Sequence, residues 1–347
     1  MTIFDKYIAI FCVGLSLSSC ITTQSVPIDQ LEPGKISLAS PIRKVALISR
    51  NFKFSGDTIS GYFNLNFRLQ KGTKKDNRII DSISVTKSLE NLRKALLESG
   101  RFDEVFVYPF NAIKPHSGIK QLPFSQGYIK SLCAESSTDA VISLEMLSSF
   151  YSAHKGSAGR EINGSANVKV TAIWSVYTPE NDGPLDRYTH SEVVRWNEYS
   201  PEDQKKYELP RRKEAVQIAC GRAAKNYSNR VVPNWVESSR NLLVMNDPEF
   251  DKALAYAKQN KWKEATQYWK KYLSGSNSRV AGIAALNYAV GQEMLGDFEQ
   301  AKFWSDKSVN LLKNGEAGKV ARGYAAILYE RHLKAANLNA QLNVDHK

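Results

Sequence analysis

The sequence predicts a mixed α+β region followed by an all-helical region, and three observations carry this prediction. An order of strand, helix and strand occurs between residues 44 and 108. Apolar and polar residues alternate strictly between residues 167 and 176, which is typical of a strand with one buried face. In the last third of the chain, β-branched runs disappear and helix-forming residues dominate. We therefore expect an α/β module with antiparallel strands over residues 43–235 and a helical domain over residues 236–347.

The N-terminus carries the pattern of a bacterial lipoprotein signal. An apolar run over residues 7–17 is shorter than the ~20 residues that a membrane-spanning helix needs. It ends in Leu17-Ser18-Ser19-Cys20, where small residues precede a cysteine. We expect a signal peptide over residues 1–19, cleavage before Cys20, acylation of the Cys20 thiol, and an acylated tether over residues 20–42. An ordinary secretory signal that happens to contain a cysteine is the alternative.

The residues after Cys20 indicate the destination of the anchor. Ile21 follows the cysteine, and the absence of an aspartate there favours the outer membrane over the inner membrane. No acidic cluster follows, which favours the periplasmic side over the cell surface. The expected membrane contact is therefore a lipid anchor at Cys20 on an outer-membrane protein that faces the periplasm.

The charge balance of the chain is strongly basic. Its 347 residues include 42% hydrophobic and 24% charged residues, with a formal net charge of +12. In this compartment nucleic acid is not an expected partner, whereas anionic lipid headgroups, acidic glycans or an acidic protein are. A basic stretch over residues 71–78 is expected to be a loop, and its cations are candidate anion-binding residues: Lys71, Lys74, Lys75 and Arg78. A basic surface without a dedicated ligand is the alternative.

Two cysteines remain beyond the signal and Cys20. Cys133 and Cys220 both lie in expected helices, and the sequence allows either two buried free thiols or one disulfide bond between them. No paired-cysteine motif or His/Cys cluster suggests a metal, and no cofactor is expected.

The first part of the α/β module is expected to contain a strand at residues 44–49, a helix over residues 85–99 and a strand over residues 102–108. Leu89, Leu92, Leu96 and Leu97 share one helical face, and Gly100 suits the residue after the helix end. The joint from Leu96 to Val105 resembles the helix-to-strand joint of periplasmic α/β modules such as the N-terminal domain of TolB and the curli secretion lipoprotein.

The second part is expected to be an antiparallel meander. Strands are predicted at residues 140–146, 167–176 and 188–196, after a short helix at residues 125–133. A Gly/Ser-rich hairpin loop is expected at residues 154–164. A helix that begins near Pro210 is predicted to end at Pro233-Asn234-Trp235.

The helical region contains a repeated phrase. Asn260-Lys261-Trp262-Lys263-Glu264-Ala265 and Gly296-Asp297-Phe298-Glu299-Gln300-Ala301 share their pattern and lie 36 residues apart. Ala253 and Ala289 occupy equivalent small positions upstream, whereas Ser305 departs from the aromatic residue Trp269. This resembles the inter-helix turn of a tetratricopeptide repeat, whose period is about 34 residues. A generic bundle of helical hairpins is the alternative.

Taken together, these features resemble a family of outer-membrane lipoproteins of Bacteroidota. The lipoprotein signal, the α/β module with a tryptophan-bearing meander and the short repeat tail carry the resemblance. It implies a location and a fold, and it brings no activity with it.

No catalytic phrase for a nucleophile, a zinc protease, a dinucleotide or a phosphate loop occurs, and we expect no enzymatic activity. The leading hypothesis is a protein-interaction or assembly module of the cell envelope, which holds a protein partner in the groove of its repeats. The candidate groove residues are Tyr256, Trp262, Tyr288 and Gln292. The alternative is a binding protein for an anionic envelope glycan or lipopolysaccharide.

Overall fold

The computed structural model describes residues 22–36, 38, 41–50, 52–54, 61–114, 116–118, 120–158, 161–200, 202 and 205–342. Cys20 and the predicted signal peptide lie outside the described residues. The described chain divides into two compact units: residues 33–234 with 337–342, called the α/β unit, and residues 22–32 with 235–336, called the helical unit. No described helix is long and apolar enough to cross a membrane.

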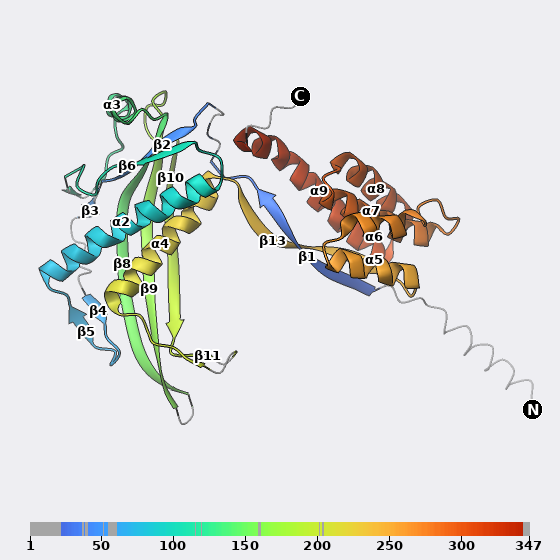
Figure 1. Ribbon diagram of the computed structural model, residues 1–347, viewed down its shortest axis with the longest axis horizontal. Helices are drawn as coiled ribbons and strands as arrows, with labels where there is room; N and C mark the ends of the chain where they lie inside the picture. Colours follow the sequence, from blue (N-terminus) through green and yellow to red (C-terminus); the bar gives the residue numbers. More distant parts are fainter. Residues whose placement is uncertain are drawn as a thin grey trace, which may run out of the picture. The chain divides into compact units, whose positions relative to one another are not determined.

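The α/β unit contains a mixed seven-stranded sheet in the order β10-β9-β8-β2-β6, with β4 paired to β8 and β5 paired to β4 (Figure 1). The strands are β2 (Lys44–Ser49), β3 (Lys53–Phe54), β4 (Gly61–Phe63), β5 (Leu69–Lys71), β6 (Glu104–Val107), β7 (Ser117–Gly118), β8 (Ala140–Ala158), β9 (Glu161–Tyr177), β10 (Asp186–Asn197), β11 (Tyr199–Ser200) and β12 (Lys205–Lys206). The helices are α2 (Lys74–Glu98), α3 (Gln126–Ser136) and α4 (Arg212–Val231).

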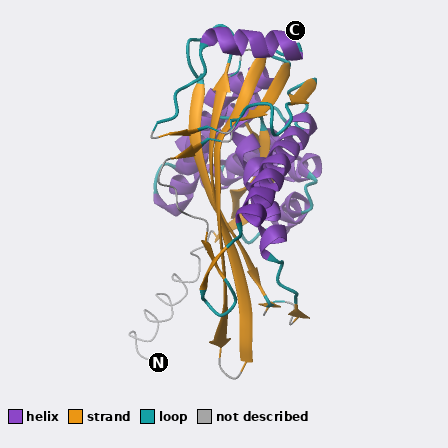
Figure 2. Cartoon of the chain, turned by 90° about the vertical axis from the view of Figure 1, so that its left-hand side faces the viewer, coloured by secondary structure: helices purple, strands orange, loops and turns teal. Residues whose placement is uncertain are grey.

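The central strand β2 is apolar on both faces because helices cover both faces of the sheet. It runs parallel to β6 and to the start of β8. Val45 and Leu47 face α2 and α4, whereas Ala46 and Ile48 face α3. Figure 2 shows the sheet with its helices from the side. The predicted order of strand, helix and strand is therefore present as β2, α2 and β6.

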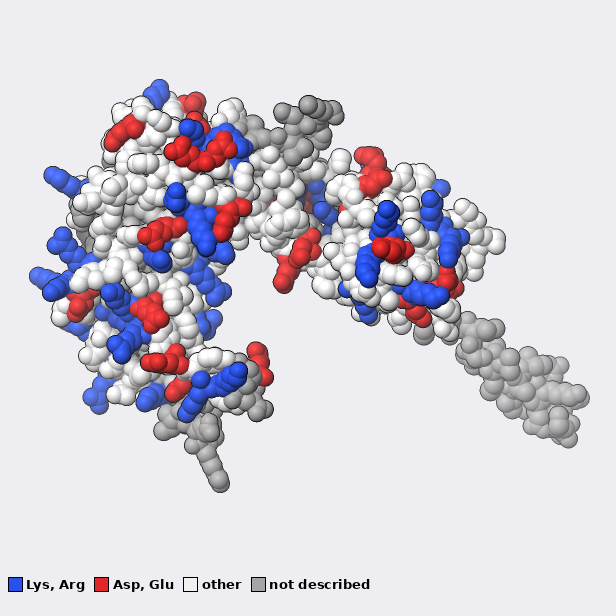
Figure 3. Space-filling model, in the orientation of Figure 1, with Lys and Arg blue, Asp and Glu red and all other residues white. Residues whose placement is uncertain are grey.

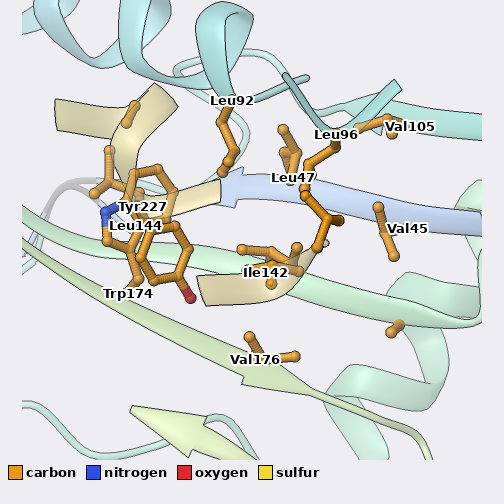
Figure 4. Packing of buried hydrophobic residues seen from close by; sticks show 14 of the residues in the cluster. Val45, Leu47, Leu92, Leu96, Val105, Ile142, Leu144, Trp174, Val176 and Tyr227 are labelled. Atoms are coloured by element: carbon orange, nitrogen blue, oxygen red, sulfur yellow. The ribbon is translucent and has the colours of Figure 1, made fainter. Parts of the chain in front are cut away.

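The main core lies between the sheet and the helix pair of α2 and α4. Leu92 and Leu96 of α2 cover apolar side chains from β2 and β8, including Leu47 and Ile142 (Figure 4). Trp174 of β9 is fully buried and stacks on Tyr227 of α4, with ring centroids 4.9 Å apart. The apolar residues of the alternation that predicted β9, such as Trp174 and Val176, therefore lie on the core face of the sheet.

The antiparallel meander is present, but its hairpin is longer than expected. Strands β8 and β9 pair from Val141↔Tyr177 to Ala158↔Glu161, so the stretch that we expected to be a loop over residues 154–164 is mostly strand. Glycine and serine are poor strand formers in isolation, and here the long ladder of main-chain hydrogen bonds outweighs that preference.

The helical unit contains two helical hairpins, a closing helix and a two-stranded ribbon. Its elements are β1 (Thr22–Glu32), β13 (Asn234–Val244), α5 (Pro248–Lys258), α6 (Trp262–Lys270), α7 (Ser278–Met294), α8 (Phe298–Leu312) and α9 (Gly315–Leu342). Asn260 and Gly296 take left-handed conformations at the equivalent turns, with φ of 59° and 84°. The repeated phrase therefore marks two inter-helix turns, as its pattern predicts.

Two segments differ from the sequence-based expectation. Residues 22–32, expected as part of a tether, form β1, where Val26, Ile28 and Gln30 are buried in alternation. Residues after Pro233, expected to lead into helices, first form β13. Pro27 is compatible with β1 because a two-stranded ribbon leaves main-chain donors on its outer edges unpaired.

Candidate interaction surfaces

The residues predicted to line a repeat groove serve mainly in internal packing. Trp262 is buried, and its indole Nε1 donates a hydrogen bond to Asn260. Tyr256 stacks on Tyr268, with centroids 5.7 Å apart, and Tyr288 meets Trp304 edge to face at the same separation. The two ring contacts join the helices of each hairpin, and the Trp262 hydrogen bond joins α6 to the turn before it.

Tyr288 and Gln292 also interact with each other. Burial raises the pKa of the Tyr288 phenol, and a hydrogen bond with Gln292 partly opposes that rise. Both side chains remain half-buried. Tyr256, Tyr288 and Gln292 are therefore half-buried and Trp262 is buried, and the groove that these four residues are expected to line stays a prediction.

A different groove lies between α8 and α9. Its volume is about 280 Å³. The lining residues are Phe298, Glu299, Lys302, Ser305, Asp306, Ala325, Leu328, Tyr329 and His332. Tyr329 is 62% exposed, and Leu333, one turn further along α9, is 53% exposed. The groove therefore combines an apolar floor with a rim that carries both charge signs.

The wall of this groove rests on a buried ion network. Glu293 of α7 is 0% exposed and accepts two hydrogen bonds from Arg240 of β13, at 2.7 and 2.9 Å. Arg331 of α9 also donates to Glu293, and its guanidinium lies 5.0 Å from the centre of the Phe298 ring. The network thus joins the ribbon, α7 and α9, and it positions one side of the groove.

Two guanidinium groups hold the Glu293 carboxylate in its ionised form. Burial by itself raises the pKa of Glu293, but the hydrogen bonds and positive charges of Arg240 and Arg331 outweigh burial and lower that pKa. Gln30 of β1 accepts a further hydrogen bond from Arg240 at 2.8 Å. A glutamate with this set of donors is held ionised, and its role is structural.

The predicted basic loop over residues 71–78 is mostly helix. Helix α2 begins at Lys74, so Lys74, Lys75 and Arg78 occupy its first turns, and Lys71 ends β5. All four side chains are exposed. The helix begins this early because Thr73 caps its N-terminus. Thr73 Oγ1 accepts a hydrogen bond from the Asp76 backbone N–H at 3.1 Å and donates one to the Asp76 carboxylate at 2.6 Å.

Two of these cations line a groove in the α/β unit. Lys74 and Arg78 lie on the wall of a cavity of about 580 Å³. The other lining residues are Ser49, Phe52, Asn77, Asp81, Ser84, Val85, Phe110, Asn111, Leu147 and Ser149. Lys75 and Lys71 lie outside it. The structure therefore divides the predicted anion-binding set between a groove and the open surface.

Both cysteines are buried free thiols. Cys133 and Cys220 pack in separate apolar clusters, with α3 and with α4 respectively. Burial raises the pKa of the Cys220 thiol to about 12 and also raises that of Cys133. Among the described residues, no group of three or more His, Cys, Asp or Glu could hold a metal ion.

The residues missed by sequence reasoning carried weak signals. The Thr73-x-x-Asp76 spacing indicates a helix start, but the apolar periodicity begins later and hid it. Glu293 lies in a strongly apolar helix, which is a signal for a paired buried charge. Its partner Arg240 is 53 residues away, and nothing local indicates it.

Solved structures with a distant similarity include two forms of the PelC dodecamer from Paraburkholderia phytofirmans. One is 9% identical with a TM-score of 0.24, covering 60% of this chain and 99% of that chain. The other is 10% identical with a TM-score of 0.22, covering 59% and 97%. A neuraminyllactose-binding hemagglutinin homologue from Helicobacter pylori is 8% identical with a TM-score of 0.25, covering 58% and 86%. No curated protein matches the chain.

Two protein-family models match the sequence. Residues 251–335, within the helical unit, match DUF6340, a domain of unknown function. Residues 42–243 match DUF8603, also a domain of unknown function, over more than half of the chain. The chain therefore belongs to the DUF8603 family and carries a DUF6340 region after it.

Proposed function

We propose that this protein is a non-enzymatic interaction module of the cell envelope, anchored through acylated Cys20 in the outer membrane and facing the periplasm. Its helical unit would bind an amphipathic helix of an envelope protein in the groove between α8 and α9. The observation that carries the proposal is the uncovered apolar side of α9 beside that groove.

The phase of the repeats explains why a helix is the expected occupant. Helices α5 with α6, and α7 with α8, form hairpins, and α9 follows in the position of the next first helix. One side of α9 packs into the core through Ala321, Tyr324 and Leu328. In a repeat array the following helix would cover the other side. Among the described residues no further helix follows α9, and Tyr329 and Leu333 remain exposed there.

The chemistry of the groove defines the partner segment. Phe298, Leu328 and Tyr329 offer apolar contacts to residues at helical spacing. Lys302 on one hand, and Glu299 and Asp306 on the other, give the rim charges of both signs. The expected partner helix has one apolar stripe flanked by residues of both signs.

A photo-crosslinker tests this surface in the lipidated protein in cells. Placed at residue 329, it should capture a defined envelope protein, identified by mass spectrometry, and the double variant Phe298→Ser/Leu333→Ser should abolish that product. The matched control is Ile218→Ser, an exposed apolar residue of α4 that lies outside this unit. Capture of lipid alone, or an unchanged product in the double variant, would contradict the proposal.

A second candidate is binding of an anionic glycan or lipopolysaccharide, favoured by the groove that Lys74 and Arg78 line. Its polar side chains, Asn77 and Asn111 among them, suit sugar hydroxyl groups, and the two cations suit a carboxylate or phosphate. Arg78→Gln should weaken binding of lipopolysaccharide, and binding should fall with rising salt. Lys94→Gln is the matched control, since Lys94 is exposed on the same helix but lies outside the groove. Equal losses in both variants would exclude this groove as the site.

A further inference from the structure

The β4–β5 hairpin carries an exposed apolar tip. Leu65, Phe67 and Leu69 are 38%, 61% and 61% exposed. All three lie within five consecutive positions at the end of the hairpin. Burying such residues is favourable, and single exposed ones are common, but three on one protruding turn form a local apolar surface.

The tip is built by specific hydrogen bonds. The Asn64 side-chain oxygen accepts from the backbone N–H groups of Asn66 and Arg68, at 3.1 and 3.0 Å. The Lys155 backbone N–H donates to the Leu65 carbonyl at 2.9 Å, which joins the tip to β8. The conformation of the tip is therefore set before any partner arrives.

Phe67 occupies a backbone region that aromatic residues rarely adopt. Its φ is 55°, in the left-handed region, where a side chain costs about 1–2 kcal/mol. Its ring stacks on Phe63 at 4.7 Å and meets His154 edge to face, yet most of its surface faces solvent. Strain of this kind persists where the surrounding contacts enforce it, and it is concentrated at functional sites.

Exposed cations lie at the tip and along the chain that follows it. Arg68 is part of the tip and Lys155 contacts it, whereas Lys71 ends the hairpin and Lys74 and Lys75 begin α2. Arg68, Lys71, Lys74, Lys75 and Lys155 are all exposed. Figure 3 shows Lys and Arg side chains gathered on the edge of the α/β unit where Figure 1 places the β4–β5 hairpin and the start of α2. None of these five cations makes an ion pair with another described residue. Long basic side chains around an aromatic and aliphatic tip match the headgroup and acyl layers of an anionic bilayer.

We propose that the β4–β5 tip is a membrane-docking wedge for anionic phospholipid, in which Phe67 and Leu69 enter the interfacial layer. Arg68 and Lys155 at the tip, with the lysines of the hairpin base and of the start of α2, would contact lipid phosphates. A protein partner is the less favoured occupant because the apolar residues project from a narrow turn instead of lining a groove. The wedge is independent of the groove between α8 and α9, so either proposal can fail alone.

Vesicle co-sedimentation tests the wedge. The probe protein is residues 21–347, which lacks the acyl anchor and retains every described residue. We expect binding to vesicles of phosphatidylcholine mixed with phosphatidylglycerol, little binding to phosphatidylcholine alone, and a loss of binding at high salt. Excess glycerol phosphate, the free headgroup, should not displace the protein, because it offers no apolar layer.

Two sets of variants separate the apolar and the basic parts. Phe67→Ser/Leu69→Ser should reduce vesicle partitioning at least about tenfold. Lys71→Gln/Lys74→Gln/Lys75→Gln should reduce it about a hundredfold. The matched controls are Ile218→Ser for the first set and Lys130→Gln/Lys213→Gln/Lys225→Gln for the second, all at exposed positions of the same unit.

A spectroscopic variant guards against loss of folding. The chain already holds six tryptophans, so the signal is the difference in emission between each variant and the parent chain. For Phe67→Trp this difference spectrum should shift to the blue with anionic vesicles and be quenched by brominated lipid, whereas that for Ile218→Trp should not change. No binding to anionic vesicles, equal binding to neutral vesicles, unaltered binding of Phe67→Ser/Leu69→Ser, or unchanged emission of Phe67→Trp would each overturn the proposal.

Discussion

Among the residues whose burial the structure describes, each unit fully buries one glutamate, and the two carboxylates have different partners. Glu293 in the helical unit is paired with two arginines. Glu145 in the α/β unit accepts from the neutral donors Tyr177 and Gln121, at 2.8 and 2.6 Å, and from the partly exposed Arg50 at 3.1 Å. The Glu293 carboxylate meets two guanidinium groups, whereas the Glu145 carboxylate meets one guanidinium and two neutral donors.

The positions of the two glutamates explain this difference. Glu145 is the extra residue at the register shift of β8, between the pairs Leu144↔Trp174 and Met146↔Ile173. A bulge of this kind turns a side chain away from the regular alternation, and here it brings the carboxylate to neighbouring polar groups. Glu293 lies within a regular helix, so its partners come from separate elements. A buried carboxylate in this fold can therefore either stabilise a local irregularity or join distant segments.

The largest expected effect is at the paired glutamate. Glu293→Gln leaves Arg240 buried without a counter-charge, and we expect a loss of about 3–5 kcal/mol in the free energy of unfolding of the helical unit. Amide hydrogen exchange of the full chain, measured by mass spectrometry, should become faster in α7 and α9. Exchange in β8 and β9 should not change. The control is Glu264→Gln, at an exposed position of the same unit. Unchanged exchange in α7 would show that the network is not a stabilising joint.

Acid should break the same network. The pKa of Glu293 is lowered in the folded chain, so its contribution to stability is present above its unfolded pKa of about 4.3 and is lost as the pH falls through the folded value. We expect the helical unit to lose stability below about pH 4.3. Thermal unfolding at a series of pH values should show this loss, and the pH dependence should be weaker in Glu293→Gln. An equally steep dependence in the variant would assign the loss to other carboxylates.

A smaller effect is expected at the second glutamate. Glu145→Gln keeps one acceptor oxygen for Tyr177, Gln121 and Arg50, and Arg50 can still reach solvent, so we expect a loss of about 1–3 kcal/mol from the α/β unit. The phenol of Tyr177, whose pKa burial and the nearby Glu145 charge raise to about 12, should titrate at lower pH in this variant. Ultraviolet titration of the tyrosines, with Glu180→Gln as an exposed control, measures this shift. A loss as large as that of Glu293→Gln would remove the distinction between the two arrangements.

A still smaller and equal effect is expected at one turn in each unit. Gly100 and Gly296 both have positive φ, and a methyl group at either position would meet no neighbouring atom within 4 Å. Only the backbone preference is therefore changed, and Gly100→Ala and Gly296→Ala should each cost about 1 kcal/mol. Denaturant unfolding of the two variants provides the measurement. Markedly unequal losses would indicate that one turn has strain beyond its φ.

The smallest effect is expected at the two thiols, which should not react with an alkylating reagent in the folded protein. Cys220 and Cys133 are buried with raised pKa values, so the reactive thiolate is scarce and inaccessible. Iodoacetamide at neutral pH should label neither thiol until denaturant is added. Rapid labelling of Cys133 alone would indicate local opening of α3, whereas labelling of both would indicate opening of the whole α/β unit.

Sequence reasoning worked best where the determining interactions are local. The alternation around Trp174, the leucines of α2, the left-handed Gly100 and the two turns at Asn260 and Gly296 all depend on near neighbours, and each was predicted. It failed for β1 and β13, because a two-stranded ribbon is defined by the pairing of segments about two hundred residues apart. The predicted family resemblance to Bacteroidota lipoproteins and the lipid anchor at Cys20 remain predictions.

Periodicity and backbone preference over a few residues were enough to predict a mixed α/β region followed by a helical region, and to place the two inter-helix turns. The pairing of charges, and the division of aromatic residues between core and surface, depend on contacts between distant segments. Arg240 meets Glu293, Trp262 turns inward, and Phe67 and Tyr329 stay exposed because distant segments either cover a side chain or leave it uncovered. The surfaces proposed for binding depend on that coverage, so a reading of the chain alone could not locate them.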